Sequence, residues 1–346
     1  MNRDTTVVKL GSSLIATDDG HPRRSLLDQV ATDVAAALHA HTSVVIVSSG
    51  AIALGKAKLQ GQLAGVPELA ALQAASALGQ AELQRLWQTA FDPHNLHTAQ
   101  ILLSASDVHR RASYLNVRQA LTALLLSGAI PVVNENDATA TDEISFGDND
   151  VLAAQTAVLL RARRLLLLTN VDGIQRTPPG RGRPSLIADG DAVEESMFGE
   201  GSSVGRGGIA SKVAAARLAA SGGVETFVAA PARLSQLFAG VHSGTRFAAA
   251  ATGESAFRLW LRHGAQVVSR LTVDDGAAAA IRERGASLLA VGVLEWSNAF
   301  QAGDAVLICS TTHEPLARGI ASVDASSVVG RQQGVEVVHR DRLLLT

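Results

Sequence analysis

From the N-terminus to Gly244, short runs of consecutive apolar residues alternate with segments in which apolar residues recur every three or four positions. Uninterrupted apolar runs are typical of strands buried on both faces, and the wider spacing is typical of amphipathic helices. This alternation predicts an α/β fold, a three-layer α/β/α sandwich whose mostly parallel sheet is joined by crossover helices. Ser113 is the expected N-cap of one helix and Gly128 its C-terminal stop. The predicted strands are 7–10, 44–47, 99–103, 130–133, 165–168 and 224–229, and the predicted helices lie at 27–38, 69–87, 113–127, 151–160 and 213–220.

The pattern changes after Gly244, where an alanine-rich stretch precedes short strand-like segments. Single hydrophobic cores rarely grow beyond about 250–300 residues, so a chain of 346 residues is expected to form two domains. The second is predicted to be small and β-rich, with strands at 266–269, 288–293 and 305–309 and one helix at 276–284. We therefore expect a first domain at 1–246, a linker at 247–257 and a second domain at 258–346.

Composition narrows the class of protein. With 47% hydrophobic residues the chain has enough apolar material for a core, and its net charge of -2 argues against a nucleic-acid coat. Cys309 is the only cysteine, which excludes an intrachain disulfide and favours a reducing cytoplasm. We find no signal peptide and no apolar run long enough to span a membrane, so no membrane partner is expected.

Lysine is rare: four of the 30 basic residues are lysines, and Lys9 directly precedes a Gly/Ser turn. A strand that delivers a lysine to such a turn, here Gly11 and Ser12, can bind a phosphate through backbone amides and the ammonium group. A turn with an edge lysine is the alternative. The small residues that follow strand 44–47, Ser49, Gly50 and Ala51, form either a tight strand-to-helix turn or an anion site at a helix start.

Two polar quartets are the most informative segments. Asn134–Asp137 (NEND) and Gly147–Asp150 (GDND) follow a buried strand and precede a buried helix. Repeated Asn and Asp side chains favour recognition of a small molecule that has both an ammonium and a carboxylate group; a solvated loop is the alternative.

A glycine-rich loop provides the last cluster. It leads into a helix with Lys212 in the opening turns, and such a loop can fold over a polyphosphate. Lys9 and Lys212 would then flank one phosphate site. No Cys/His or clustered histidine pattern occurs, so no protein metal ligand is expected. The candidate loop residues are Arg206, Gly207, Gly208, Ile209, Ala210, Ser211 and Lys212.

The order and spacing of VVKLGSS, VIVSSGAIALG, IPVVNENDATAT, FGDND and LLLLT resemble the glutamate 5-kinases of the amino-acid kinase superfamily. The segment LTVDDGAAAAIRERGASLLAVGV resembles the PUA domain at the C-terminus of bacterial members. NEND followed by GDND is specific to these kinases, whereas KxGxS is shared with uridylate, carbamate, acetylglutamate and aspartate kinases. The likeness covers nearly the whole chain and implies the amino-acid kinase fold followed by a PUA-like domain.

The resemblance implies ATP-dependent phosphorylation of the side-chain carboxylate of L-glutamate, the first step of proline biosynthesis. It implies Mg²⁺ bound mainly through the ATP phosphates, feedback inhibition by proline and a homodimer or homotetramer. It also implies that Asp150 holds Lys9 and Lys212 in place as the catalytic residues. Carried over residue by residue, and joined with the turns above, the expected substrate contacts are Ser49, Gly50, Ala51, Asn134, Asp137 and Asn149, and the expected ATP contacts are Lys9, Gly11, Ser12, Thr169, Asn170 and Arg206 to Lys212.

The chain departs from the family pattern at the nucleotide contacts. Asn170 stands where the family usually has aspartate, Arg206 where it has threonine and Ile209 where it has methionine. These changes are expected to alter nucleotide binding more than phosphoryl transfer.

Two alternatives remain: another kinase of the superfamily, acting on aspartate or acetylglutamate, or an RNA-associated PUA protein. From residue 258 onward, nine arginines balance nine acids, which counts against RNA.

Overall fold

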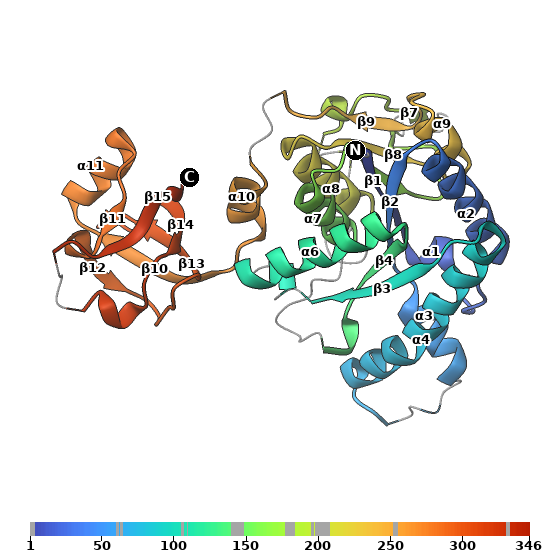
Figure 1. Cartoon of the computed structure of the whole chain (residues 1–346), viewed down its shortest axis with the longest axis horizontal. Helices are drawn as coiled ribbons and strands as arrows, with labels where there is room; N and C mark the ends of the chain where they lie inside the picture. The colour runs from blue at the N-terminus through green and yellow to red at the C-terminus, as the bar shows by residue number, and fades with distance from the viewer. Residues whose placement is uncertain are drawn as a thin grey trace. The chain divides into compact units, whose positions relative to one another are not determined.

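The computed structural model of the chain comprises two compact units. One unit comprises Met1–Ala105 and Arg118–Glu254, and the other comprises Ser106–Val117 and Ser255–Thr346. Figure 1 colours the chain from blue at the N-terminus to red at the C-terminus. The structure describes residues 4–59, 62, 65–104, 107–108, 110–139, 149–176, 184–194, 197, 208–251, 255–329 and 333–346.

One seven-stranded sheet forms the centre of the first unit (Figure 1). Its strands are β1 (Asp4–Leu10), β2 (Thr42–Ser48), β3 (Thr98–Leu103), β4 (Ile130–Glu135), β5 (Arg164–Leu168), β8 (Glu225–Ala229) and β9 (Thr245–Phe247). Their spatial order is β3-β4-β2-β1-β5-β8-β9, and all neighbours are parallel except β8 and β9. β1 is therefore central, and its last residue, Leu10, is level with Ser48 of β2 and Leu168 of β5.

Helices cover both faces of this sheet. They are α1 (Ser12–Ile15), α2 (Arg24–His39), α3 (Ala51–Leu59), α4 (Glu68–Phe91), α7 (Asn149–Leu160), α8 (Ile209–Ser221) and α9 (Leu234–Phe238). α2, α4 and α9 share one apolar core with Val8 and Leu10 of β1. α7 and α8 pack on each other, α7 also against β1 and α8 against β5 and β8. Because strand residues alternate between faces, Lys9 points away from the α2 side, toward α7 and α8.

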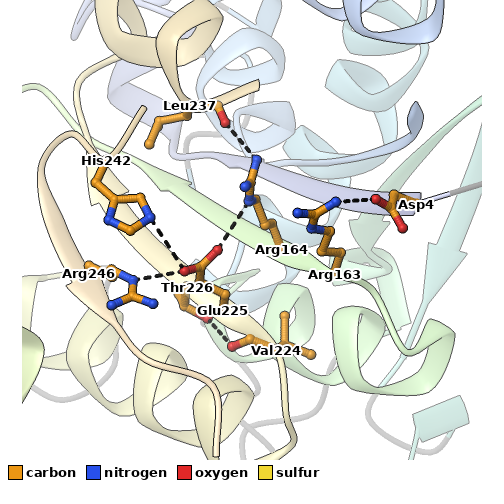
Figure 2. Close-up of polar contacts among 9 residues, drawn as sticks. All are labelled: Asp4, Arg163, Arg164, Val224, Glu225, Thr226, Leu237, His242 and Arg246. Atoms are coloured by element: carbon orange, nitrogen blue, oxygen red, sulfur yellow. Dashed lines mark hydrogen bonds and ion pairs between the residues drawn. The ribbon is translucent and has the colours of Figure 1, made fainter. Parts of the chain in front are cut away.

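The amino-terminal ends of the strands are held by ion pairs (Figure 2). The carboxylate of Glu225, at the start of β8, accepts hydrogen bonds from Arg246 Nε of β9 at 2.8 Å and Arg164 Nε of β5 at 3.2 Å. Burial alone raises the pKa of Glu225, but the two guanidinium groups outweigh it and the pKa lies below its usual value. Arg163 pairs with Asp4 of β1 in the same region. This network fastens the sheet at the end opposite to the strand carboxyl ends.

The second unit contains a six-stranded sheet ordered β11-β15-β14-β13-β10-β12, antiparallel except between β10 and β13. Asp274 caps its helix α11 (Asp275–Arg284), accepting a hydrogen bond from the Ala277 amide at 2.8 Å. The strands are β10 (Val267–Val273), β11 (Leu288–Leu289), β12 (Val293–Trp296), β13 (Ala305–Cys309), β14 (Pro315–Ala321) and β15 (Glu336–Leu345).

Residues 106–117, which include the start of α6 (Arg111–Ser127), belong to the second unit through aromatic contacts. The indole N–H of Trp260, which follows the short helix α10 (Ala256–Leu259), donates to the carbonyl of Val108 at 2.6 Å. The guanidinium group of Arg111 lies 5.0 Å from the ring centre of Phe257 and 5.5 Å from that of Trp260. Stacking of a cation on aromatic faces is favourable, so this segment is tied to the C-terminal part of the chain.

The predicted fold class is confirmed, and each of the six predicted strands of the first domain is present to within three residues at either end. The helix expected to begin at Ser113 begins two residues earlier, at Arg111, the residue whose guanidinium group stacks on Phe257. Phe247, expected to open the linker, is the last residue of β9 and is buried. The expected strand 288–293 is broken by a turn at Ala290–Gly292, and β14 and β15 were not predicted.

A second, two-stranded sheet pairs β6 (Gln175–Arg176) with β7 (Ser185–Leu186) in the first unit. Across the described ranges, no helix combines the length and apolar character needed to cross a bilayer.

Candidate active site

Three charged side chains from different elements meet on the face of the sheet toward which Lys9 points. Lys9 Nζ of β1 lies 2.6 Å from Asp150 Oδ1, and Lys212 Nζ of α8 lies 2.9 Å from Asp150 Oδ2. The exposed fractions of the three side chains are 3%, 7% and 0% for Lys9, Lys212 and Asp150. The expectation that Asp150 pairs with both lysines, which are far apart in the chain, is met. We call these three residues the charged triad.

The electrostatics of the charged triad favour an anionic partner. Burial alone raises the pKa of Asp150, but the ammonium groups of Lys9 and Lys212 outweigh it, so the pKa lies below its usual value. Asp150 is therefore ionised at neutral pH, and one carboxylate faces two ammonium groups. Two ammonium groups held side by side in a buried setting are suited to stabilise the charge of a phosphoryl group.

The turns that follow β1 and β5 contain residues that are expected to contact the nucleotide. Gly11 is adjacent to the charged triad, since a Cβ atom built there would lie 3.7 Å from Lys9 Nζ. Asn170, which follows β5, donates from Nδ2 to Ser13 Oγ at 3.1 Å, so the two turns are connected. Thr169 donates its backbone N–H to Ala229 at the end of β8. Ser12, which lies between Gly11 and Ser13 in the chain, is the first residue of α1.

The opening turn of α8 completes this side of the site. Gly208 precedes the helix, and its carbonyl accepts the backbone N–H of Lys212 at 3.3 Å. Ile209, Ala210 and Ser211 form the turn between them, and the buried Ser211 hydroxyl has no hydrogen-bond partner in the described part of the chain. The remaining expected loop contacts, Arg206 and Gly207, lie outside the described residues.

The turn between β2 and α3 holds the first of the expected substrate contacts. Gly50 has a φ of +106°, and a Cβ atom there would lie 2.7 Å from Ile15 Cγ2, so only glycine fits without strain. Ser49 donates its backbone N–H to Leu10 of β1 at 3.0 Å, which ties the turn to the strand of Lys9. Ala51 is the first residue of α3 and is buried.

The expected substrate residues of the two quartets are brought together with this turn. Asn149, at the start of α7, donates from Nδ2 to Ser49 Oγ at 3.0 Å. The backbone N–H of Glu135 donates hydrogen bonds to two side-chain oxygens, Asn134 Oδ1 at 2.8 Å and Asn149 Oδ1 at 3.3 Å. β4, β2 and α7 thus converge on one hydrogen-bonded group. Because Asn149 is followed by Asp150, the group directly adjoins the charged triad.

Asp137 is held from α4, which the sequence indicated only as a core helix. Ser76 Oγ donates to Asp137 Oδ2 at 2.9 Å, and one turn further along α4, Gln80 Oε1 accepts from Asn134 Nδ2 at 2.8 Å. Burial raises the pKa of Asp137, and the Ser76 hydrogen bond offsets part of that rise. Sequence reasoning missed Ser76 and Gln80. The sequence pattern that could have identified them is a pair of polar residues four positions apart on an otherwise apolar helix face.

The sheet order explains why these groups meet. β4 and β2 lie on one side of β1 and lead into the expected substrate contacts, whereas β5, which leads into Thr169 and Asn170, and the strands against which α8 packs lie on the other side. Residues 4–230 match the model of the Amino acid kinase family, and residues 269–341 match that of the PUA domain. The chain belongs to the amino acid kinase family. Lys9, on the central strand, thus lies where the two halves of this amino acid kinase meet.

Relatives resemble this chain over most of its length. The glutamate 5-kinase of Alcanivorax borkumensis is 39% identical over 366 residues, covering 99% of this chain and 97% of the relative. The glutamate 5-kinase of Nocardia farcinica is 40% identical over 336 residues, covering 94% and 91%. Among solved structures, a Giardia carbamate kinase aligns with a TM-score of 0.52 at 16% identity, covering 71% of this chain and 99% of that protein. This last likeness shows the fold alone.

Proposed function

We propose that this amino acid kinase transfers the γ-phosphoryl group of ATP to the side-chain carboxylate of L-glutamate, giving ADP and L-glutamyl 5-phosphate, the first step of proline biosynthesis in the cytoplasm. The charged triad is the observation that carries the proposal, because it holds two ammonium groups side by side, between the residues expected to bind glutamate and those expected to bind ATP. The relatives named glutamate 5-kinase support the choice of acceptor.

The acceptor needs no general base. The side-chain carboxyl of glutamate has a pKa of about 4.3, so it is ionised at neutral pH and is itself the nucleophile. The enzyme must bring two anions together in line and neutralise charge on the phosphoryl group in flight. Lys9 and Lys212 supply that neutralisation, and Asp150 fixes the direction of both ammonium groups. Asp150 is a positioning residue in this scheme.

Each substrate has its own set of contacts. On the acceptor side, Asp137 accepts the substrate ammonium group, Ser49 and Asn149 hydrogen-bond the amino acid, and the amides of Gly50 and Ala51 face carboxylate oxygens. Asn134 shapes the same pocket through its hydrogen bonds.

On the donor side, the turns at Gly11–Ser12 and Thr169–Asn170 and the start of α8 hold ATP. Asp150 is already engaged by two ammonium groups, so Mg²⁺ is held through the phosphate oxygens of ATP and water. Bound there, the ion adds further charge neutralisation at the phosphates.

ADP release from the purified full-length protein tests the proposal. We expect release with Mg²⁺-ATP to depend on L-glutamate and to exceed the release with L-aspartate or N-acetyl-L-glutamate. The acyl phosphate product is trapped with hydroxylamine as the hydroxamate, which separates transfer from ATP hydrolysis. A higher rate with aspartate or N-acetylglutamate, or ADP release indifferent to glutamate, would overturn the assignment in favour of another kinase of the superfamily.

Regulation and assembly are part of the same proposal. We expect proline to lower the glutamate-dependent rate and the protein to form a homodimer or homotetramer. Adding proline to the ADP assay and measuring mass by light scattering check both expectations. The second domain, with its balance of nine arginines and nine acids, is expected to act in regulation or assembly rather than in RNA binding.

A further inference from the structure

α4 provides two buried polar side chains one helical turn apart, each bonded to a residue of the expected acceptor site. Ser76 is 3% exposed and donates to Asp137, and Gln80 is 7% exposed and accepts from Asn134. Residues four apart on a helix lie on the same face, so one face of α4 meets both ends of the NEND quartet. Burying a polar side chain on a core helix lowers the stability of the fold unless the side chain forms a hydrogen bond there.

The same stretch of α4 is pressed against the other half of the acceptor site. Gly79 lies between the two polar residues, and a Cβ atom there would overlap the carbonyl oxygen of Ala51, the first residue of α3. Further along the helix, Trp87 Nε1 donates to Ser48 Oγ at 3.0 Å, on the strand that leads into the same turn. α4 therefore contacts both chain segments that are expected to bind the amino acid, and it has no room to shift toward α3.

Ser76 sets the orientation of the Asp137 carboxylate. Its hydroxyl engages Oδ2, which leaves Oδ1 for an ammonium group. Asp137 is largely buried, where a carboxylate without a hydrogen-bond donor is disfavoured in its charged form. Removing the Ser76 hydroxyl would therefore release the carboxylate from its orientation and weaken its charged form, and both effects disfavour the bound ammonium group.

Gln80 acts through a longer series of hydrogen bonds. By accepting from Asn134 Nδ2, it directs Asn134 Oδ1 to the backbone N–H of Glu135. That N–H is shared with Asn149, which in turn donates to Ser49. The Gln80 Nε2 atom is buried and has no hydrogen-bond partner among the residues that the structure describes. The hydrogen bond that its Oε1 atom accepts from Asn134 is thus the contact through which Gln80 acts.

We propose that Ser76 and Gln80 are positioning residues that set the affinity of this site for its amino-acid substrate, Ser76 through Asp137 and Gln80 through Asn134. The inference rests on the proposed function, since it takes the NEND quartet as the acceptor site. In this inference, α4 holds both chain segments that are expected to bind the amino acid, the NEND quartet and the turn between β2 and α3, in a fixed position.

Two substitutions test the inference. Ser76→Ala removes the hydroxyl, and Gln80→Met keeps the length of the side chain without its amide. Gln84→Met is the matched control, because Gln84 lies one turn beyond Gln80 and donates to Thr98, the first residue of β3, rather than to the NEND quartet. We expect Gln80→Met to raise KM for glutamate about 3- to 10-fold, the range of one lost neutral hydrogen bond, and Ser76→Ala to raise it about 10-fold or more, because its partner is a charged carboxylate. KM for ATP should stay within twofold of wild type in both variants. The control should leave KM for glutamate unchanged.

A double-mutant cycle separates positioning from general damage. In an Asp137→Asn background, Ser76→Ala should produce no further rise in KM for glutamate, because Ser76 then has no charged partner to hold. An equal rise in both backgrounds, or a wild-type KM in both Ser76→Ala and Gln80→Met, would overturn the inference. Those results are distinct from failure of the proposed function, in which the wild-type protein itself releases no ADP in response to glutamate.

Discussion

Replacing Asp150 by asparagine tests the charged triad at its centre. The substitution keeps the size of the side chain but removes the carboxylate that bridges two buried ammonium groups at 2.6 and 2.9 Å. At an effective dielectric constant of about 20, each contact corresponds to about 6 kcal/mol of Coulomb energy before desolvation is subtracted. Breaking a buried ion pair by removing one partner has a net effect of about 3–5 kcal/mol. We therefore expect the variant to lose about 3–5 kcal/mol of stability.

Thermal unfolding followed by circular dichroism measures this loss. For domains of 150–250 residues, 1 kcal/mol corresponds to about 2–4 °C, so the midpoint should fall by about 6–20 °C. The pH dependence gives a second check. The pKa of Asp150 is lowered by folding, so the stabilisation is present above the unfolded-state pKa of about 3.9 and is lost as pH falls through the lower folded value. A midpoint within 2 °C of wild type at pH 7 would refute the buried, ionised triad.

Three further substitutions give separate readouts. Lys9→Ala should lower kcat by about 10²-fold or more, the effect of losing one preorganised electrostatic donor, and near-normal turnover in the coupled ADP assay would reject its role. Asp137→Ala should raise KM for glutamate while KM for ATP stays near wild type, because it removes the partner of the substrate ammonium group; a change confined to ATP in steady-state kinetics would contradict this. Gly79→Ala should destabilise the protein by about 1–3 kcal/mol, since its methyl group overlaps the Ala51 carbonyl, and an unchanged denaturant midpoint would show that α3 and α4 are not in such close contact.

The apolar runs of the first unit predicted its strands well, because a parallel sheet covered on both faces leaves an uninterrupted hydrophobic pattern. β9 escaped prediction because it has only three residues, Thr245–Phe247, and pairs antiparallel at the edge. β15 escaped because the polar residues 339–342 interrupt its apolar positions. The association of residues 106–117 with the second unit depends on the stacking of Arg111 on distant rings, which no local pattern contains.

The candidate site was predictable where a chemically distinctive residue stands next to a glycine-containing turn or loop. Lys9 and Lys212 stood out because lysine is rare in this chain, and their pairing with Asp150 was implied by family resemblance rather than by spacing. Ser76 and Gln80 were not predictable in the same way. Their role depends on how α4 packs against β4 and α3, and that packing is a tertiary property. A polar pair on a core helix is the sequence pattern that points to such residues.

A crystal structure with Mg²⁺, L-glutamate and the non-hydrolysable analogue AMP-PNP tests the central claim most directly. We predict that the ammonium groups of Lys9 and Lys212 both lie within hydrogen-bond distance of the terminal phosphate, with Asp150 still between them. Glutamate should place its side-chain carboxylate in line with that phosphorus and its ammonium group on Asp137. A terminal phosphate bound away from both lysines, or glutamate bound with its side chain pointing away from the nucleotide, would contradict the proposed transfer.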